Sequence, residues 1–119
     1  MHLEVTFRNL NSRAEVTKRG QALFKKLHKF LDSASEGHLT VSVEHSQAII
    51  ELVITAHGQT YKTHEEHDEL KAAIDLAFHR METQLRRGKE RRNDRRGRGV
   101  PEDDGEFVTD SGEDEYEEV

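Results

Sequence analysis

Apolar and polar residues alternate in three segments of the chain, 2–8, 39–43 and 50–56. A period of two is typical of strands that bury one face, and the second and third segments are close enough to pair as antiparallel strands. The segment 57–59 contains a glycine, which accepts the positive φ of a tight turn, and 60–65 is rich in Thr and Tyr. We therefore predict four strands, of which the last three follow one another directly.

Two further segments repeat their apolar residues at the helical period. The first runs from about 12 to 31, and Gly20 within its stripe suggests close approach to another element. The second helix is predicted to begin near His67 or Asp68 and to end near Arg87, and the Asp68 side chain can cap free N–H groups. The apolar stripes are Val16, Gly20, Leu23, Leu27 and Phe30 in the first helix and Leu70, Ile74, Ala77, Met81 and Leu85 in the second.

The predicted order of elements is β-α-β-β-β-α. Because each strand has one apolar face and each helix has one apolar stripe, both helices should cover the same face of the sheet. We predict an α+β two-layer sandwich with two helices on one face of a four-stranded sheet, like that of a double-stranded-RNA-binding domain. With 33% hydrophobic residues, the chain has room for one core, which we assign to a domain over residues 1–92.

Charge is divided sharply along the chain, although the formal net charge is only −6. Residues 1–79 carry nine Lys and Arg against eleven Asp and Glu, residues 80–100 carry nine against three, and residues 101–119 carry none against ten. Residues 93–119 contain too few apolar side chains to offset the entropy lost on ordering, which predicts a disordered basic arm followed by an acidic tail. The basic region can bind a polyanion locally, because salt screens charge beyond about 8–10 Å.

The predicted first helix carries a basic stripe on the side opposite its apolar stripe. On a helical wheel, Lys18, Lys25 and Lys29 lie at about 180–220° from Val16, and Lys26 widens the stripe on one flank. One interpretation is a solvated face without a partner. The other is a surface for a polyanion, which depends on a second basic element beside it.

The predicted second helix supplies such an element. Arg80, Arg87 and Arg91 share one of its flanks, Lys89 lies on the other flank, and Arg86 points outward. If the two helices lie side by side, their basic faces form a positive surface suited to phosphate. No aromatic platform for stacked bases accompanies these residues, so recognition of structured RNA by shape and backbone is favoured over reading of sequence.

Other chemistry has little support in the sequence. The absence of cysteine excludes disulfides and thiolate-ligated zinc. His64 and His67 enclose two glutamates, but this spacing is not that of a zinc-binding helix, so we expect no metal and no cofactor. Without a phosphate loop, a nucleophile elbow or a convergent carboxylate pair, we expect no enzymatic activity and no small-molecule substrate. The N-terminal residues show no export signal or membrane helix, which predicts a cytoplasmic protein.

Several stretches in the order of a known family span about residues 2–92. They are Arg8-Asn9, Lys26-Leu27-His28-Lys29-Phe30, Asp68-Glu69-Leu70-Lys71-Ala72-Ala73-Ile74-Asp75, and Met81-Glu82-Thr83-Gln84-Leu85-Arg86-Arg87 with Lys89 and Arg91. With these stretches the chain resembles the bacterial ribosome hibernation promoting factors and ribosome-associated inhibitors, whose domain is β-α-β-β-β-α. The acidic tail is similar to that of the short inhibitor type.

The resemblance implies a translation inhibitor of the stress response and stationary phase. Such a protein binds 16S rRNA in the channel between the head and body of the small ribosomal subunit, where messenger and transfer RNAs sit, and keeps the 70S ribosome idle. We expect a monomer without the additional domain that pairs ribosomes in longer members. The resemblance implies rRNA contacts by Lys26, Lys29, Arg80, Arg86, Arg87, Lys89 and Arg91, to which the helical wheel alone adds Lys18 and Lys25.

Some positions depart from the family pattern. Ala22 and Leu23 stand where members often carry Lys or Arg, which shifts the expected contact toward Lys18 and Lys25. Gly88 replaces a bulkier residue and is expected to end the second helix early. Two alternative functions remain open from the residues alone, a generic domain that binds structured RNA and a protein-interaction regulator whose acidic tail mimics nucleic acid.

Overall fold

The computed structural model describes the backbone of residues 1–98 and the side chains of residues 1–93. The elements are β1 (His2–Arg8), α1 (Ala14–Lys25), a 3-10 helix η1 (His28–Phe30), β2 (Glu36–Glu44), β3 (Gln47–Ala56), β4 (Gln59–His67) and α2 (Leu70–Arg98). The chain divides after Arg86 into two units, so α2 begins in the first unit and continues in the second. The predicted order β-α-β-β-β-α is confirmed.

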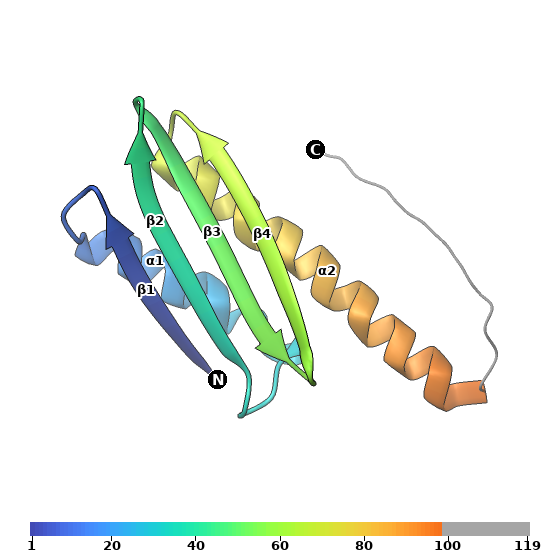
Figure 1. Ribbon diagram of the computed structural model, residues 1–119. Coiled ribbons are helices and arrows are strands. Elements are labelled where there is room, and N and C mark those ends of the chain that lie inside the picture. Colours follow the sequence, from blue (N-terminus) through green and yellow to red (C-terminus); the bar gives the residue numbers. More distant parts are fainter. Residues whose placement is uncertain (99–119) are drawn as a thin grey trace. The chain divides into compact units, whose positions relative to one another are not determined.

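The sheet has the strand order β1-β2-β3-β4. β1 pairs with β2 in parallel, which requires a crossover connection, and α1 provides it. The pairs β2–β3 and β3–β4 are antiparallel hairpins. His57 and Gly58 form the second hairpin turn with φ values of 54° and 75°, as a two-residue turn with two positive φ angles requires. Both helices lie behind the sheet in Figure 1, so the two-layer α+β sandwich is confirmed.

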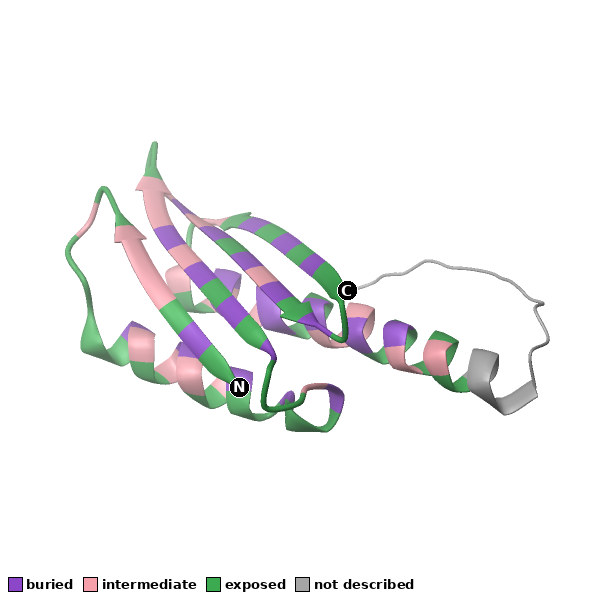
Figure 2. Cartoon of the chain, turned by 60° about the horizontal axis from the view of Figure 1, so that its bottom comes forward, coloured by how far each residue is buried: buried purple, intermediate pink, exposed green. Residues whose placement is uncertain are grey.

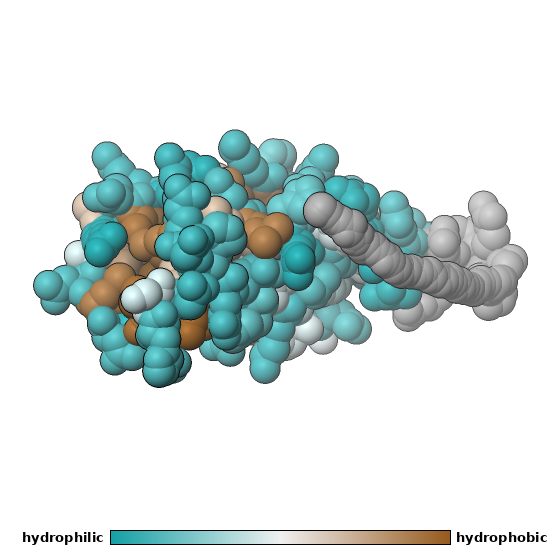
Figure 3. Space-filling view, turned by 90° about the horizontal axis from the view of Figure 1, so that it is seen from above, coloured by the Kyte–Doolittle hydropathy of each residue, from teal (hydrophilic) through white to brown (hydrophobic). Residues whose placement is uncertain are grey.

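The core lies between the sheet and the two helices. Every second residue of β3 is buried, and Figure 2 shows the same alternation along the neighbouring strands. Leu39, Ile50, Leu52 and Ile54 are fully buried on this face. The surface seen in Figure 3 is mainly hydrophilic, with smaller hydrophobic patches between the polar side chains.

Gly20 marks the close approach that its place in the apolar stripe suggested. A Cβ atom at Gly20 would lie 2.9 Å from Cδ2 of Leu39, which is a fully buried residue of β2. A side chain at this position would therefore push α1 away from the sheet or force Leu39 to move.

The first helix ends earlier than predicted. α1 stops at Lys25, and the N–H of Leu27 donates to the carbonyl oxygen of Phe24 at 3.0 Å, which tightens the chain toward η1. Phe24 is 2% exposed and occupies the core, whereas Leu23 is only partly buried. Leu23 packs against the core from its edge, so the predicted apolar stripe is confirmed, and Phe24 is a buried residue that the prediction left out.

The second helix is longer than predicted. α2 continues through Gly88 to Arg98, so the predicted end near Arg87 was wrong, and residues 93–98 are helical where disorder was predicted. One glycine costs a helix about 1 kcal/mol relative to alanine, and the surrounding Arg, Lys and Glu residues are strong helix formers. The domain boundary after residue 92 stays a prediction, and the acidic tail lies outside the described residues.

The start of α2 is close to the predicted position. α2 begins at Leu70, and the N–H of Glu69 donates to Nδ1 of His67 at 2.9 Å. Asp68 instead lies 3.0 Å from the same imidazole nitrogen. The N–H that precedes α2 is thus bound by the His67 imidazole, which the Asp68 carboxylate also contacts.

Candidate nucleic-acid interface

Opposite charges gather on the two faces of the sandwich. On the helix side, residues 14–30 and 70–86 carry eight Lys and Arg against three Asp and Glu. The strand residues that alternate with the buried ones point to the outer face of the sheet. This face carries five glutamates and two basic residues. The outward-facing charged residues of the strands are Glu4, Glu36, Glu44, Glu51, Glu66, Arg8 and Lys62. Within the first unit, the helix side is therefore the face suited to a polyanion.

The lysines of the predicted basic stripe are exposed. Lys18 and Lys25 lie on α1, Lys26 is its C-terminal cap, and Lys29 lies on η1. No carboxylate among residues 1–93 pairs with Lys18, Lys25 or Lys26. The ammonium group of Lys29 lies 5.4 Å from the centre of the Phe30 ring. Because α1 ends before Lys29, the helical wheel that joined Lys29 to Lys18 does not apply to it.

A bidentate ion pair fastens α1 to α2. Nε of Arg19 donates to Oδ1 of Asp75, and Nη2 of Arg19 donates to Oδ2, both at 2.7 Å. This hydrogen bonding to Asp75 raises the pKa of Arg19 above its ordinary value. We name this pair the interhelix clamp. Sequence reasoning did not find it, because a helical wheel shows which flank Asp75 occupies and does not show what lies opposite.

The interhelix clamp aligns the basic residues of the two helices. α1 and α2 run in the same direction behind the sheet (Figure 1), and the clamp joins the sixth residue of each. At 1.5 Å per residue, Lys25 lies about 9 Å beyond the clamp along α1, and Arg86 lies about 16 Å beyond it along α2. Asp75 and Arg86 are separated by eleven residues, which returns Arg86 to the flank that faces α1.

Arg80 lies on the opposite flank of α2, over the edge strand β4. Its Nη1 atom is 3.0 Å from Oε2 of Glu65, which is a buried residue of β4. The side-chain amide of Gln84, one turn further along, donates to the carbonyl oxygen of Lys62 on the same strand at 2.8 Å. The structure therefore does not place Arg80 beside the lysines of α1. The alternation Tyr61, Thr63, Glu65 was the sequence signal that could have identified Glu65 as a buried partner.

Arg86 remains a candidate contact on the side of α1. Its side chain is 50% exposed, and Nη2 lies 3.5 Å from Oε2 of Glu82. Exposed pairs at this helical spacing contribute only about 0.3–0.5 kcal/mol. A phosphate could therefore displace Glu82 at little cost.

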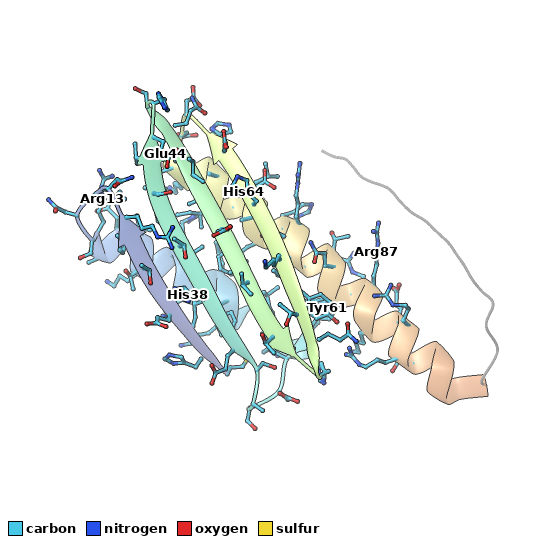
Figure 4. The ribbon with its side chains drawn as sticks, viewed as in Figure 1. Arg13, His38, Glu44, Tyr61, His64 and Arg87 are labelled. Atoms are coloured by element: carbon cyan, nitrogen blue, oxygen red, sulfur yellow. The ribbon has the colours of Figure 1, made fainter. Side chains whose placement is uncertain are left out.

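The remaining predicted contacts belong to the second unit. Arg87, Lys89 and Arg91 lie on the continuation of α2, where Arg87 and Arg91 are one turn apart and exposed. Figure 4 shows the Arg87 side chain extending from the helix. The RNA contacts expected of these three residues stay a prediction.

The histidines that invited a metal hypothesis do not converge. His64 faces outward on β4, as Figure 4 shows, and its Nε2 atom lies 3.6 Å from Glu66. His67 is an odd number of residues further along the strand and lies on the other face of the sheet. Within residues 1–93, no three His, Asp or Glu side chains are placed to hold a metal ion. No helix in the described part is long and apolar enough to cross a membrane.

Comparison with known proteins identifies relatives of this fold. A family model described as Sigma 54 modulation protein / S30EA ribosomal protein matches residues 3–93. The N-terminal domain of Protein Y from Thermus thermophilus is 26% identical, with a TM-score of 0.69 over 73% of this chain and 98% of that chain. A ribosomal subunit interface protein from Coxiella burnetii is 23% identical, with a TM-score of 0.64 over 76% of this chain and 99% of that chain. No curated protein matches the sequence.

Proposed function

Because the chain belongs to the Sigma 54 modulation protein / S30EA ribosomal protein family, we propose that it is a ribosome hibernation factor that binds 16S rRNA through its helix side. In this proposal the protein enters the channel of the small subunit that messenger and transfer RNAs use. Occupancy of the channel blocks initiation and keeps the 70S ribosome inactive. The protein acts as a cytoplasmic monomer in the stress response and stationary phase, without catalysis.

The separation of charge between the two faces carries the proposal. The helix side of the first unit has an excess of five positive charges, whereas the outer face of the sheet has an excess of three negative charges. A phosphate backbone is therefore attracted to one face and repelled by the other. This asymmetry gives the protein a defined orientation in an RNA-lined channel.

The kind of side chain on the helix side favours recognition of the RNA backbone. Lysines and arginines bond phosphate oxygens without reading bases. Among the described residues, the large hydrophobic side chain that is exposed is Met1, and the phenylalanine and tyrosine rings are buried or partly buried. These features fit a folded RNA surface, such as that of the small subunit, better than a single-stranded message.

Sedimentation with purified small subunits and 70S ribosomes tests the proposal. The test variant, Lys18→Gln with Lys25→Gln, removes two positive charges from the helix side. The matched control, Arg8→Gln with Lys62→Gln, removes two positive charges from the outer face of the sheet. We expect the wild type and the control to co-sediment with ribosomes at modest salt, and the test variant to lose about tenfold or more in affinity.

Either of two results would contradict the proposal. Equal loss in both variants would show that only net charge matters. Undiminished ribosome binding by the test variant would instead favour binding to a protein partner, as expected of a protein-interaction regulator. Competition with a generic RNA duplex distinguishes a hibernation factor from a generic domain that binds structured RNA. A hibernation factor keeps its preference for the small subunit in the presence of the duplex.

A further inference from the structure

Glu65 is a carboxylate on the face of β4 that is packed against the core. On β4, Tyr61, Thr63 and Glu65 face the helices, and each is no more than 8% exposed. The hydroxyl of Thr63 donates to the carbonyl oxygen of Ala77 on α2 at 3.2 Å, which fixes the strand against the helix. Glu65 therefore lies under α2, where an ionised group needs a compensating charge.

Arg80 supplies that charge. Its Nη1 atom lies 3.0 Å from Oε2 of Glu65, and the two side chains are 57% and 9% exposed. Within the described residues, no hydrogen bond of good geometry reaches Oε2 of Glu65. The attraction between the two side chains is thus mainly one of charge, and one end of the guanidinium is tied to a buried point.

The Arg80 side chain stays more than half exposed beside Glu65. Arginine has five N–H donors in a rigid fork, and Nη1 is the atom of Arg80 that lies 3.0 Å from Glu65. An arginine that is already held in one orientation loses less conformational entropy when it binds phosphate. We propose that Glu65 is a positioning residue for RNA binding, which holds Arg80 on the β4 flank of α2 so that its remaining donors meet an RNA phosphate.

This proposal rests on the proposed function. It predicts a change in RNA affinity for Glu65→Gln that is opposite in direction to the change expected from net charge alone. Glu65→Gln removes a negative charge, so electrostatics alone predicts tighter RNA binding. Loss of positioning predicts weaker binding, because Arg80 becomes free to adopt many rotamers. The sign of the change therefore separates the two explanations.

The experiment measures the affinity of the full chain for purified small subunits over a range of salt concentrations. We expect Glu65→Gln to weaken binding by about three- to tenfold, from the entropy of one released side chain. The matched control is Glu82→Gln, which removes the same charge from the exposed partner of Arg86. The control is expected to bind as tightly as the wild type or slightly more tightly. Thermal unfolding establishes that each variant is folded at the temperature of the measurement.

The salt dependence gives a readout that a purely structural role would not change. Loss of one phosphate contact lowers the slope of log K against log salt by up to about 0.9. We expect this decrease in Glu65→Gln and in Arg80→Ala, and no further decrease when the two substitutions are combined. The double variant removes both charges together, so it keeps the comparison possible if Arg80→Ala alone does not fold.

Unchanged or tighter binding by Glu65→Gln would overturn the positioning role, as would an unchanged slope. An equal loss from Glu65→Gln in the Arg80→Ala background would overturn it as well. Failure of the wild type to bind small subunits is a different result, because it would refute the proposed function itself.

Discussion

The interhelix clamp is predicted to stabilise the first unit by a modest amount that depends on salt. The side chains of Arg19 and Asp75 are 37% and 45% exposed, so water screens their attraction. Exposed pairs contribute about 0.2–1 kcal/mol, and the bidentate geometry at 2.7 Å places this one at the upper end of that range. We expect a coupling energy of about 1 kcal/mol, and a decrease of roughly 4–8 °C in Tm for a unit of this size when the pair is broken.

A double-mutant cycle measures this coupling. The variants are Arg19→Met, Asp75→Asn and their combination, and each is unfolded thermally at low salt and at about 1 M salt, where the Debye length is about 3 Å. The coupling should be clear at low salt and weaker at high salt. A coupling of zero at low salt would refute the clamp as a stabilising contact, and a coupling independent of salt would refute its electrostatic origin.

Three further predictions concern packing, pH and the tail. Gly37→Ala should destabilise the protein by about 1–3 kcal/mol in thermal unfolding, because the new Cβ would lie 2.9 Å from Cε1 of the buried Phe24; a smaller loss would show that this ring can move. The hydroxyl of Ser35 lowers the pKa of Asp32 most, followed by the backbone N–H of Ala34 and then by electrostatic attraction to His57. The Asp32 carboxylate therefore stabilises the fold above its unfolded pKa of about 3.9, and this contribution is lost as the pH falls through the lower folded pKa. Tm should therefore differ between wild type and Asp32→Asn at pH 6 and converge near pH 2, and a constant difference would contradict the assignment. Removal of residues 101–119, which carry ten acidic residues, should raise non-specific RNA affinity at low salt by removing a tethered competitor, and unchanged affinity would exclude that competition.

The sequence predicted the sheet well because strand burial repeats at short range. The alternation at Leu3, Val5 and Phe7 and in the two following runs is a local consequence of one buried face. Gly20 was also informative, since a glycine within an apolar stripe has few explanations other than close packing. These features needed no knowledge of which elements are neighbours.

The sequence was less informative where contacts between elements decide the outcome. The tightening of the chain after Lys25 depends on how α1 meets the sheet, and the length of α2 depends on a balance between Gly88 and its helix-forming neighbours. The candidate contacts were identified as basic and exposed, but their partners were not. Arg80 appeared equivalent to the other arginines until the structure placed it over Glu65, on the flank of α2 away from α1.

Directed cleavage of 16S rRNA tests most directly which face of the protein meets the ribosome. The chain contains no cysteine, so a single cysteine that carries a tethered iron chelate can be introduced at one chosen site. Lys25→Cys places the probe on the helix side, and Lys62→Cys places it on the outer face of the sheet. We predict strong cleavage of small-subunit RNA around the messenger and transfer RNA channel from position 25, and weak cleavage from position 62. Strong cleavage from position 62 alone, or none from either position in a bound complex, would contradict binding through the helix side.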